Sequence, residues 1–157
     1  MDNRSLNAYL KTIYVLEETK TAASTANIAK ALDITPASVS EMLQKLAKEN
    51  YVSYSPYHGV QLTVKGKEIA TKAVRKHRLL EAFLKNTLKL KDNNEVRRQA
   101  GELVHSLSDK ADQQLCIFLS RPKEDPVDRG EIPHCTKRIT CEECLKENHG
   151  KVGKPSF

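Results

Sequence analysis

Apolar residues recur at helical spacing over the first fifty residues, in three blocks separated by short polar breaks. Ser5 stands before the first block and can cap its helix, because a serine oxygen accepts the free amides of a first turn. The spaced apolar residues of this block are Leu6, Tyr9, Leu10, Ile13 and Leu16. The second block predicts a short helix over residues 25–32. The third predicts a helix from Pro36 to about Lys48, with Thr35 as its N-cap.

The pattern changes from helical spacing to alternation after residue 51. Val52 and Tyr54 alternate with polar residues before a turn, and Val60 and Leu62 do so after it. This pattern predicts a short two-stranded hairpin. Two helices joined by a two-residue turn and followed by a hairpin are typical of a winged helix-turn-helix. We therefore predict a winged helix domain over residues 1–64.

Helical periodicity returns at Val64 and continues to about Leu88. Two shorter helices are predicted beyond it, over residues 96–107 and 109–119, and Ser108 is placed to cap the second of them. The apolar stripe of the long helix contains Ile69, Ala73, His77, Leu80 and Leu84. These helices predict an all-helical domain after the winged helix.

The chain changes character again beyond Ser120. Proline, glycine and charged residues become frequent there, which is typical of irregular structure. The sequence therefore predicts a mainly α protein: the N-terminal winged helix-turn-helix, a helical domain over residues 65–120, and an irregular, cysteine-containing tail over residues 121–157.

Positive charge is concentrated in the first half of the chain. The sequence has 26 basic and 20 acidic side chains, a net charge of +6, and residues 1–80 hold 12 basic and 7 acidic ones. Clustered positive charge on a small domain favours a polyanion such as nucleic acid as partner. No apolar run is long enough to span a bilayer, and the first residues lack the pattern of a secretory signal. We expect a cytoplasmic protein without a membrane partner.

The start of the predicted third helix has the chemistry of a DNA-reading element. In a winged helix this part enters the major groove, where small polar side chains permit close approach to base edges. The candidate base-reading residues are Thr35, Pro36, Ala37, Ser38, Ser40 and Gln44. Lys45 and Lys48 follow one turn later and, with Tyr57 and His58 of the wing, are candidates for phosphate contacts. The alternative is a capped, solvated surface helix, or a winged helix that serves as a scaffold for protein interaction.

Four consecutive blocks carry a family resemblance: "AYLKTIYVLEE", "ANIAKALDITPASVSEMLQKL", "VQLTVKGKEIA" and "VRKHRLLEAFL". Their order over about residues 4–120 resembles the metal-dependent repressors of the diphtheria toxin repressor and manganese transport regulator family. The resemblance implies a homodimer whose winged helices read a palindromic operator in double-stranded DNA. It also implies that the helices after residue 64 form the dimer interface and hold the metal. The ion would act as a corepressor, by binding the DNA-competent arrangement better than the open one.

The resemblance carries over only part of the family's metal ligands. His77, Glu81 and His105 coincide with family ligands, whereas four other ligand positions hold residues that cannot take that part: Ala8, Lys11, Gly101 and Val104. Glu102 lies three residues before His105, on the same helical face, and can compensate. A site of His77, Glu81, Glu102 and His105 would suit Fe²⁺, Mn²⁺ or Zn²⁺.

Three of these residues also have a purely structural interpretation. His77 can be a hydrogen-bonded core histidine, because it stands in an apolar stripe. Glu81 can pair with Lys85, and Glu102 can be a solvated surface carboxylate.

The four cysteines suggest a second metal centre. Cys116 stands on the last predicted helix, and Cys135, Cys141 and Cys144 follow in the tail. Four thiolates suffice for a 4Fe-4S cluster or for tetrahedral Zn²⁺, and a metal would supply folding energy to a tail with little apolar content. Without a centre, Cys116 would be a small core residue and the others free or paired thiols.

These observations predict a homodimeric, DNA-binding transcription regulator that responds to iron or manganese and acts as a repressor. The alternatives are an iron-sulfur sensor of iron or redox state in which the helical metal site is lost, and a protein-interaction module on the winged helix. The sequence has no nucleophile paired with a base, no phosphate-cradling glycine loop and no paired catalytic carboxylates. We expect neither an enzyme nor a small-molecule substrate.

Overall fold

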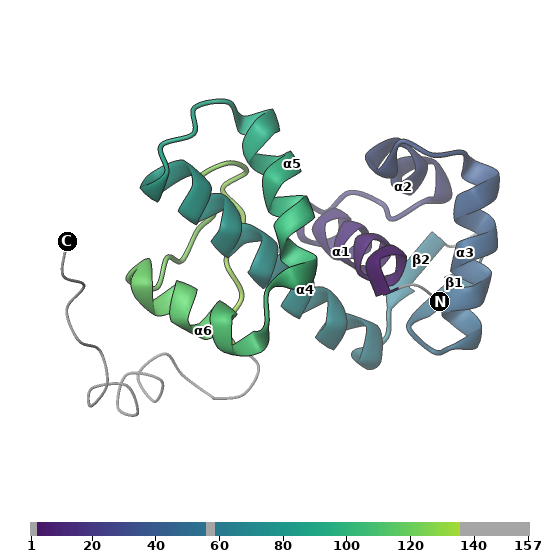
Figure 1. The fold of residues 1–157 in the computed structure, drawn as a ribbon. Coiled ribbons are helices and arrows are strands. Elements are labelled where there is room, and N and C mark those ends of the chain that lie inside the picture. Colours follow the sequence, from purple (N-terminus) through teal and green to yellow (C-terminus); the bar gives the residue numbers. More distant parts are fainter. Residues whose placement is uncertain (1–2, 56–58, 136–157) are drawn as a thin grey trace.

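The computed structural model describes residues 3–55 and 59–135. The order of its main elements is three helices, a two-stranded hairpin and three more helices (Figure 1). The elements are α1 (Asn3–Glu18), α2 (Thr25–Leu32), α3 (Pro36–Lys48), β1 (Val52–Ser55), β2 (Gly59–Leu62), α4 (Val64–Ala82), α5 (Asn93–Leu103) and α6 (Asp109–Phe118). The mainly helical fold with an N-terminal winged helix confirms the predicted fold class.

The helices of the winged helix begin where the sequence places capping side chains. Ser24 accepts a hydrogen bond from the amide of Asn27, and Thr35 accepts one from the amide of Ser38. Strands β1 and β2 pair antiparallel, with Val52 opposite Leu62. One continuous apolar core joins α1, α2, α3 and the hairpin; its fully buried members include Leu10, Ile13, Ile28, Val39, Leu43 and Leu46.

Helix α4 connects the two halves of the molecule. It packs along α1 on one side and continues into the second half, where it contacts α5 and α6 (Figure 1). The predicted helix to about Leu88 changes type after Ala82, where a π-helical turn covers Phe83–Thr87. The amide of Leu88 bonds to the carbonyl of Phe83, five residues earlier, and this wider turn ends the helix.

The other helices of the second half differ from the sequence prediction at their ends. Helix α5 begins at Asn93, earlier than predicted, because the Asp92 side chain caps its first turn. It ends at Leu103 and is followed by a 3₁₀ turn, Val104–Ser106. Ser108 caps α6 as predicted, by accepting a hydrogen bond from the amide of Ala111.

The chain after α6 packs back onto the helices. Glu124 and Glu131 form an isolated antiparallel bridge, and Ile132 is buried against Leu79 and Cys116. The prediction of irregular structure beyond Ser120 is confirmed for residues 121–135, which form no helix. This segment nevertheless contributes Ile132 to an apolar cluster. Among the helices of the described residues, none is long and apolar enough to cross a membrane.

Candidate functional site

The tip of α3 presents its predicted reading face to solvent. Thr35, Pro36, Ala37, Ser38, Gln44, Lys45 and Lys48 are exposed, and Ser40 is half-buried. On the opposite side of the helix, Val39, Leu43 and Leu46 are fully buried. The predicted reading face of α3 is therefore accessible to solvent, and it stays a prediction for DNA contact. Tyr57 and His58, the predicted wing contacts, lie outside the described residues.

Lys45 has a partner within its own helix. Its Nζ donates to Oε1 of Glu41 at 2.7 Å, and both side chains are largely exposed. The hydrogen bond from this ammonium lowers the pKa of Glu41. Lys45 is therefore partly neutralised by Glu41, and a phosphate would compete with a carboxylate for it.

The junction of α1 and α4 brings together two of the four predicted helical metal ligands. His77 Nε2 lies 3.3 Å from Glu81 Oε1, as their spacing of four residues predicts. Lys11 of α1 reaches the other side of the ring, with its Nζ 3.5 Å from Nδ1 of His77. Burial lowers the pKa of Lys11, while Glu81 opposes the shift. Gly101 faces the same ring, because a Cβ there would lie 3.9 Å from His77 Cε1.

The other two predicted ligands lie apart from this pair. Glu102 is exposed and accepts a hydrogen bond from Arg98 at 2.8 Å. His105 is exposed on the 3₁₀ turn after α5. In residues 3–55 and 59–135, no group of three potential ligands includes either of them. The alternative interpretation of Glu81 is also wrong, because Lys85 bonds to Asn93 and to the carbonyl of Lys91 instead.

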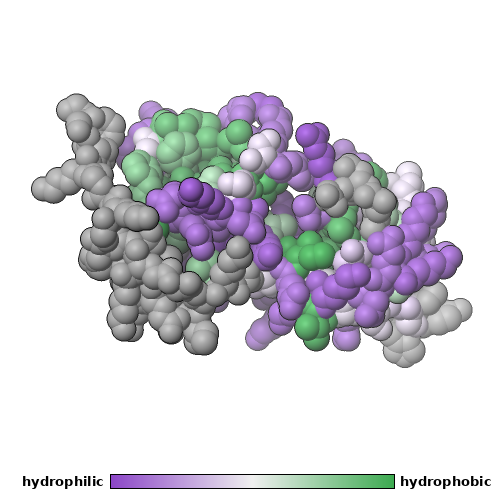
Figure 2. Space-filling view, turned by 60° about the horizontal axis from the view of Figure 1, so that its bottom comes forward, coloured by the Kyte–Doolittle hydropathy of each residue, from purple (hydrophilic) through white to green (hydrophobic). Residues whose placement is uncertain are grey.

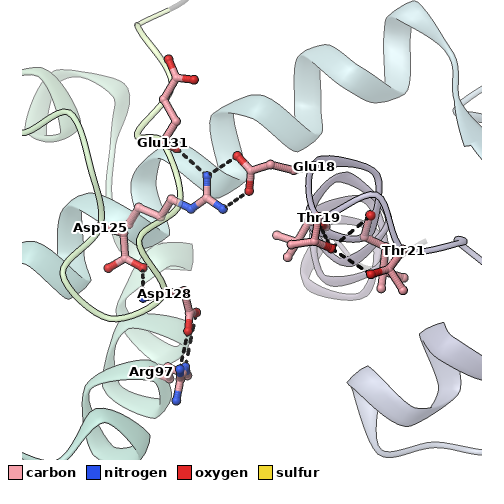
Figure 3. A network of polar contacts seen from close by, with 10 residues as sticks. Glu18, Thr19, Thr21, Arg97, Asp125, Asp128 and Glu131 are labelled. Atoms are coloured by element: carbon pink, nitrogen blue, oxygen red, sulfur yellow. Dashed lines mark hydrogen bonds and ion pairs between the residues drawn. The ribbon is translucent and has the colours of Figure 1, made fainter.

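Two carboxylates that the sequence analysis missed approach Glu81. Asp125 and Asp128 stand in the segment after α6, and one carboxylate oxygen of each lies within 4.8 Å of the others and of Glu81. Asp125 is buried; its oxygens accept the amides of Val127 and Asp128 at 3.0 and 2.9 Å. Burial raises the pKa of Asp125, partly offset by the Asp128 amide, and Glu81 raises it further. Asp128 pairs with Arg97 of α5 (Figure 3).

A buried arginine ties the same segment to the winged helix. Arg78 of α4 donates to both carboxylate oxygens of Glu18, at the end of α1, and to the carbonyl of Glu131. In Figure 3 the carboxylate of Glu18 faces this contact, whereas Glu131 contributes its backbone carbonyl and its side chain points away. Burial alone would lower the pKa of Arg78, but the bond with Glu18 raises it above its usual value. A Cβ at Gly130 would overlap this guanidinium.

Two of the four cysteines lie near another buried arginine. Arg75 pairs with Asp112 at 2.9 Å and donates to the carbonyl of Pro133 at 2.7 Å. Cys116 is buried beside Arg75 and raises the pKa of its guanidinium together with Asp112, against the opposing effect of burial. Cys135 is half-buried and lines a small pocket that Arg75 also lines. Cys141 and Cys144 lie outside the described residues.

The sequence matches known proteins over both halves. Residues 3–60 match a family described as iron dependent repressor, N-terminal DNA binding domain. Residues 63–134 match iron dependent repressor, metal binding and dimerisation domain. The fold and these matches define a winged helix regulator with a separate metal-binding half.

Two full-length relatives support the same assignment. An uncharacterized HTH-type transcriptional regulator of Methanocaldococcus jannaschii is 37% identical over 123 residues, which are 78% of this chain and 98% of that protein. The transcriptional regulator MntR of Bacillus subtilis is 33% identical over 138 residues, which are 88% of this chain and 96% of that protein. The chain belongs to the iron-dependent repressor family, as its four sequence blocks predict. These relatives are regulators, which confirms the prediction that the chain is not an enzyme.

Solved structures with the same fold include manganese regulators. The manganese regulator SloR is 36% identical, with a TM-score of 0.73 over 86% of this chain and 62% of that one. A manganese-dependent transcriptional repressor in complex with manganese is 31% identical, with a TM-score of 0.71 over 83% of this chain and 63% of that one. The chain thus spans a little over three fifths of the length of these two solved proteins.

Proposed function

We propose that this chain is a homodimeric transcriptional repressor of the cytoplasm, whose affinity for a palindromic DNA operator responds to Mn²⁺ or Fe²⁺. The observation that carries the proposal is the position of the candidate metal ligands at the joint between the two halves. His77 and Glu81 stand on α4, directly beside Lys11 of α1, and α1 is part of the winged helix core. An ion bound there would act on the orientation of the reading helix.

The physical mechanism we propose is a population shift. An ion that binds one orientation of α1 against α4 more tightly than another raises the population of that orientation. A change from mostly inactive to mostly active protein requires a difference of several kcal/mol in binding free energy, roughly 5 kcal/mol for a complete switch. Buried carboxylates supply such differences, because they are costly without a cation and favourable with one.

We propose that the ion is held in the second half, with Glu81 as a ligand. His77, Glu102 and His105 remain predicted ligands from the family resemblance. Glu102 would have to leave Arg98, an exposed pair whose contribution is about 1 kcal/mol or less. The functional division of the chain is proposed at residue 64, where α4 begins.

Dimerisation is proposed to involve the second half. Leu88, Leu103 and Phe118 expose apolar side chains there, and Phe118 packs edge-on against Phe83. Figure 2 shows a hydrophobic area on that part of the molecule, whereas hydrophilic residues dominate the middle of the same view. Apolar area of this kind favours association with a second copy of the chain.

The experiment is a fluorescence anisotropy titration of duplex DNA drawn from operator candidates, with Mn²⁺ present or removed by a chelator. We expect a Kd that changes at least tenfold between the two conditions, since coupling energies between sites reach about 1–3 kcal/mol. Affinity should fall steeply with salt, because phosphate contacts release counterions. A Kd that is independent of salt would instead favour the protein-interaction module.

Side chains of α3 provide the finer test of DNA reading. Lys45→Ala should weaken binding to all sequences and reduce the salt dependence. Ser38→Ala or Gln44→Ala should change the preferred sequence, because these side chains face the bases in the proposed complex. Equal losses on all sequences for both groups would contradict the assignment of base-reading residues.

A second candidate function is a cysteine-held 4Fe-4S cluster or Zn²⁺ site that senses iron or redox state. The observation that favours it is the position of Cys116 and Cys135, which both adjoin Arg75, a cation that would offset the charge of several thiolates. The family match ends at residue 134, so the centre would be an addition to the family's pattern. Elemental analysis and an absorption spectrum of anaerobically purified protein test this candidate. Stoichiometric iron with sulfide supports a cluster, and zinc in a colourless protein supports a structural site. If the protein contains neither iron nor zinc, the candidate is ruled out.

A further inference from the structure

Glu81 is a buried carboxylate with an unsatisfied oxygen. Its side chain is 2% exposed, and Oε1 has no hydrogen-bond donor. His77 Nε2 approaches this oxygen to 3.3 Å but does not form a hydrogen bond with it. A buried ionised carboxylate is costly unless a cation or several donors compensate it. Lys11 and Arg97 interact electrostatically with Glu81, but neither donates a hydrogen bond to Oε1.

The segment after α6 brings two further carboxylates to the same place. One oxygen each of Glu81, Asp125 and Asp128 lie within 4.8 Å of one another. Asp125 is 1% exposed, and each of its oxygens accepts a single backbone amide, which leaves lone pairs for another partner. Asp128 is exposed, and both of its oxygens accept hydrogen bonds from Arg97 (Figure 3). Three converging carboxylates repel one another, and Lys11, Arg78 and Arg97 offset this repulsion from nearby positions.

We infer that Glu81, Asp125 and Asp128 form a binding site for a hard divalent cation. Three carboxylate donors from two segments match the oxygen ligands that Mn²⁺ and Mg²⁺ prefer, and they are poor ligands for soft ions. This inference rests on the proposed function, because it names the ligands of the ion. It replaces Glu102 and His105, which lie apart from Glu81, by two aspartates of the segment after α6.

His77 takes a positioning role in this arrangement. Lys11 Nζ lies 3.5 Å from its Nδ1, and its Nε2 lies 3.3 Å from Oε1 of Glu81. The ring therefore stands between Lys11 and Glu81 and limits how that carboxylate can turn.

The proposed ion has a direct connection to the winged helix. It would fix the turn that begins at Asp125, and this turn ends at Glu131, whose carbonyl accepts a hydrogen bond from Arg78. Arg78 also holds Glu18 at the end of α1. Ordering the turn would therefore strengthen the contacts of Arg78 that join α4 to α1. Arg97 competes with the ion, because both bind Asp128.

The test is a Mn²⁺ titration of the full chain, in which electron paramagnetic resonance reports the free ion. Mn²⁺ is chosen because thiolates bind it poorly, so the cysteines do not interfere. We expect Asp128→Asn to weaken Mn²⁺ binding at least about tenfold, the lower limit for disturbing a metal ligand shell. Asp33→Asn is the matched control, because it makes the same change at an exposed turn of the winged helix, and we expect wild-type affinity.

Two further variants guard against misfolding as the cause of a loss. Arg97→Gln removes the competing cation and should tighten Mn²⁺ binding severalfold, which an unfolded protein would not do. Glu102→Gln separates the two ligand sets: loss of Mn²⁺ in this variant but not in Asp128→Asn would overturn the inference in favour of the set that contains Glu102. Wild-type Mn²⁺ affinity in Asp128→Asn would overturn it as well.

The proposed function can fail separately. If DNA affinity of the wild-type chain does not respond to Mn²⁺ or Fe²⁺ while Asp128→Asn still loses Mn²⁺, the carboxylate site stands and the regulator assignment fails. If DNA affinity responds to the ion and Asp128→Asn binds Mn²⁺ normally, the regulator assignment stands and this site fails.

Discussion

The two halves of the molecule are held together by different interactions. The winged helix has a single apolar core, in which six large side chains are fully buried. Among the described residues, the second half has two small apolar clusters and the buried charged residues Arg75, Arg78, Glu81, Asp112 and Asp125. The stabilisation from apolar burial does not depend on bound ions, whereas the free energy of a buried charge depends on the charged groups that pair with it. In the proposed function, the half with the apolar core would face the DNA, and the half with the buried charges would hold the ion.

Arg78 shows how the two kinds of region meet. It stands on α4, but its carboxylate partner Glu18 belongs to α1 of the winged helix. The charge pairs of the second half therefore extend to the apolar core of the first. A change in those pairs can tilt the winged helix as a body without disturbing its interior.

The strongest test of the comparison removes one buried charge from the second half. Arg75→Met leaves Asp112 without its cation, and Oδ1 of Asp112 already lacks a partner. We expect a loss of about 3–5 kcal/mol in the free energy of unfolding, measured by urea denaturation with circular dichroism. The double variant Arg75→Met, Asp112→Leu should recover most of it, because no unpaired charge remains. A loss below about 1 kcal/mol in the single variant would contradict the view that ion pairs hold this half.

The matching test in the winged helix removes apolar volume. Leu43→Ala should cost about 3 kcal/mol, because Leu43 is fully buried in the α3 stripe and its loss leaves a cavity. This cost should be independent of ionic strength, because no charge is removed. Ala47→Gly on the same helix is a weaker control, with an expected cost of about 1 kcal/mol. A strong salt dependence of the Leu43→Ala effect would erase the distinction between the halves.

A third test addresses the joint where α4 leaves the wing. Gly66 lies in the first turn of α4, and a Cβ at this position would overlap the carbonyl oxygen of Tyr51. Because backbone atoms cannot move aside as a flexible side chain does, Gly66→Ala should destabilise the protein by about 2 kcal/mol. Gly101→Ala is the control, since a Cβ there meets His77 only at 3.9 Å. Equal thermal stability of both variants would show that α4 is free to move relative to the wing.

The winged helix was largely predictable because its signals are local. Thr35, Pro36 and the stripe of Val39, Leu43 and Leu46 define the bounds of α3, and the structure confirms them. The end of α4 was less predictable. Helical spacing of apolar residues does not distinguish an α-helix from the π-helical turn after Ala82, because both keep a buried stripe.

The candidate metal site was predictable only in its helical part. His77 and Glu81 stand four residues apart, so their proximity follows from helix geometry. Asp125 and Asp128 are also close in sequence, in a proline-containing stretch that indicates a turn and nothing more. Their approach to Glu81 depends on the return of the chain across α4, and no sequence periodicity records such a long-range contact. A family comparison alone would also have missed them, because it directs attention to His105.

The smallest predicted effect concerns the cap of α3, where substitutions can distinguish a role in stability from a role in DNA binding. Thr35 caps α3 through its side-chain oxygen, which accepts the Ser38 amide at 3.2 Å. Thr35→Ala should cost about 1 kcal/mol of unfolding free energy, whereas Thr35→Ser keeps the oxygen and should cost almost nothing. Because Thr35 is also a candidate for base contact, both variants should be titrated with duplex DNA. If Thr35→Ser binds DNA as the wild type does and Thr35→Ala does not, the hydroxyl matters at the groove; if both bind normally, Thr35 acts only as a cap.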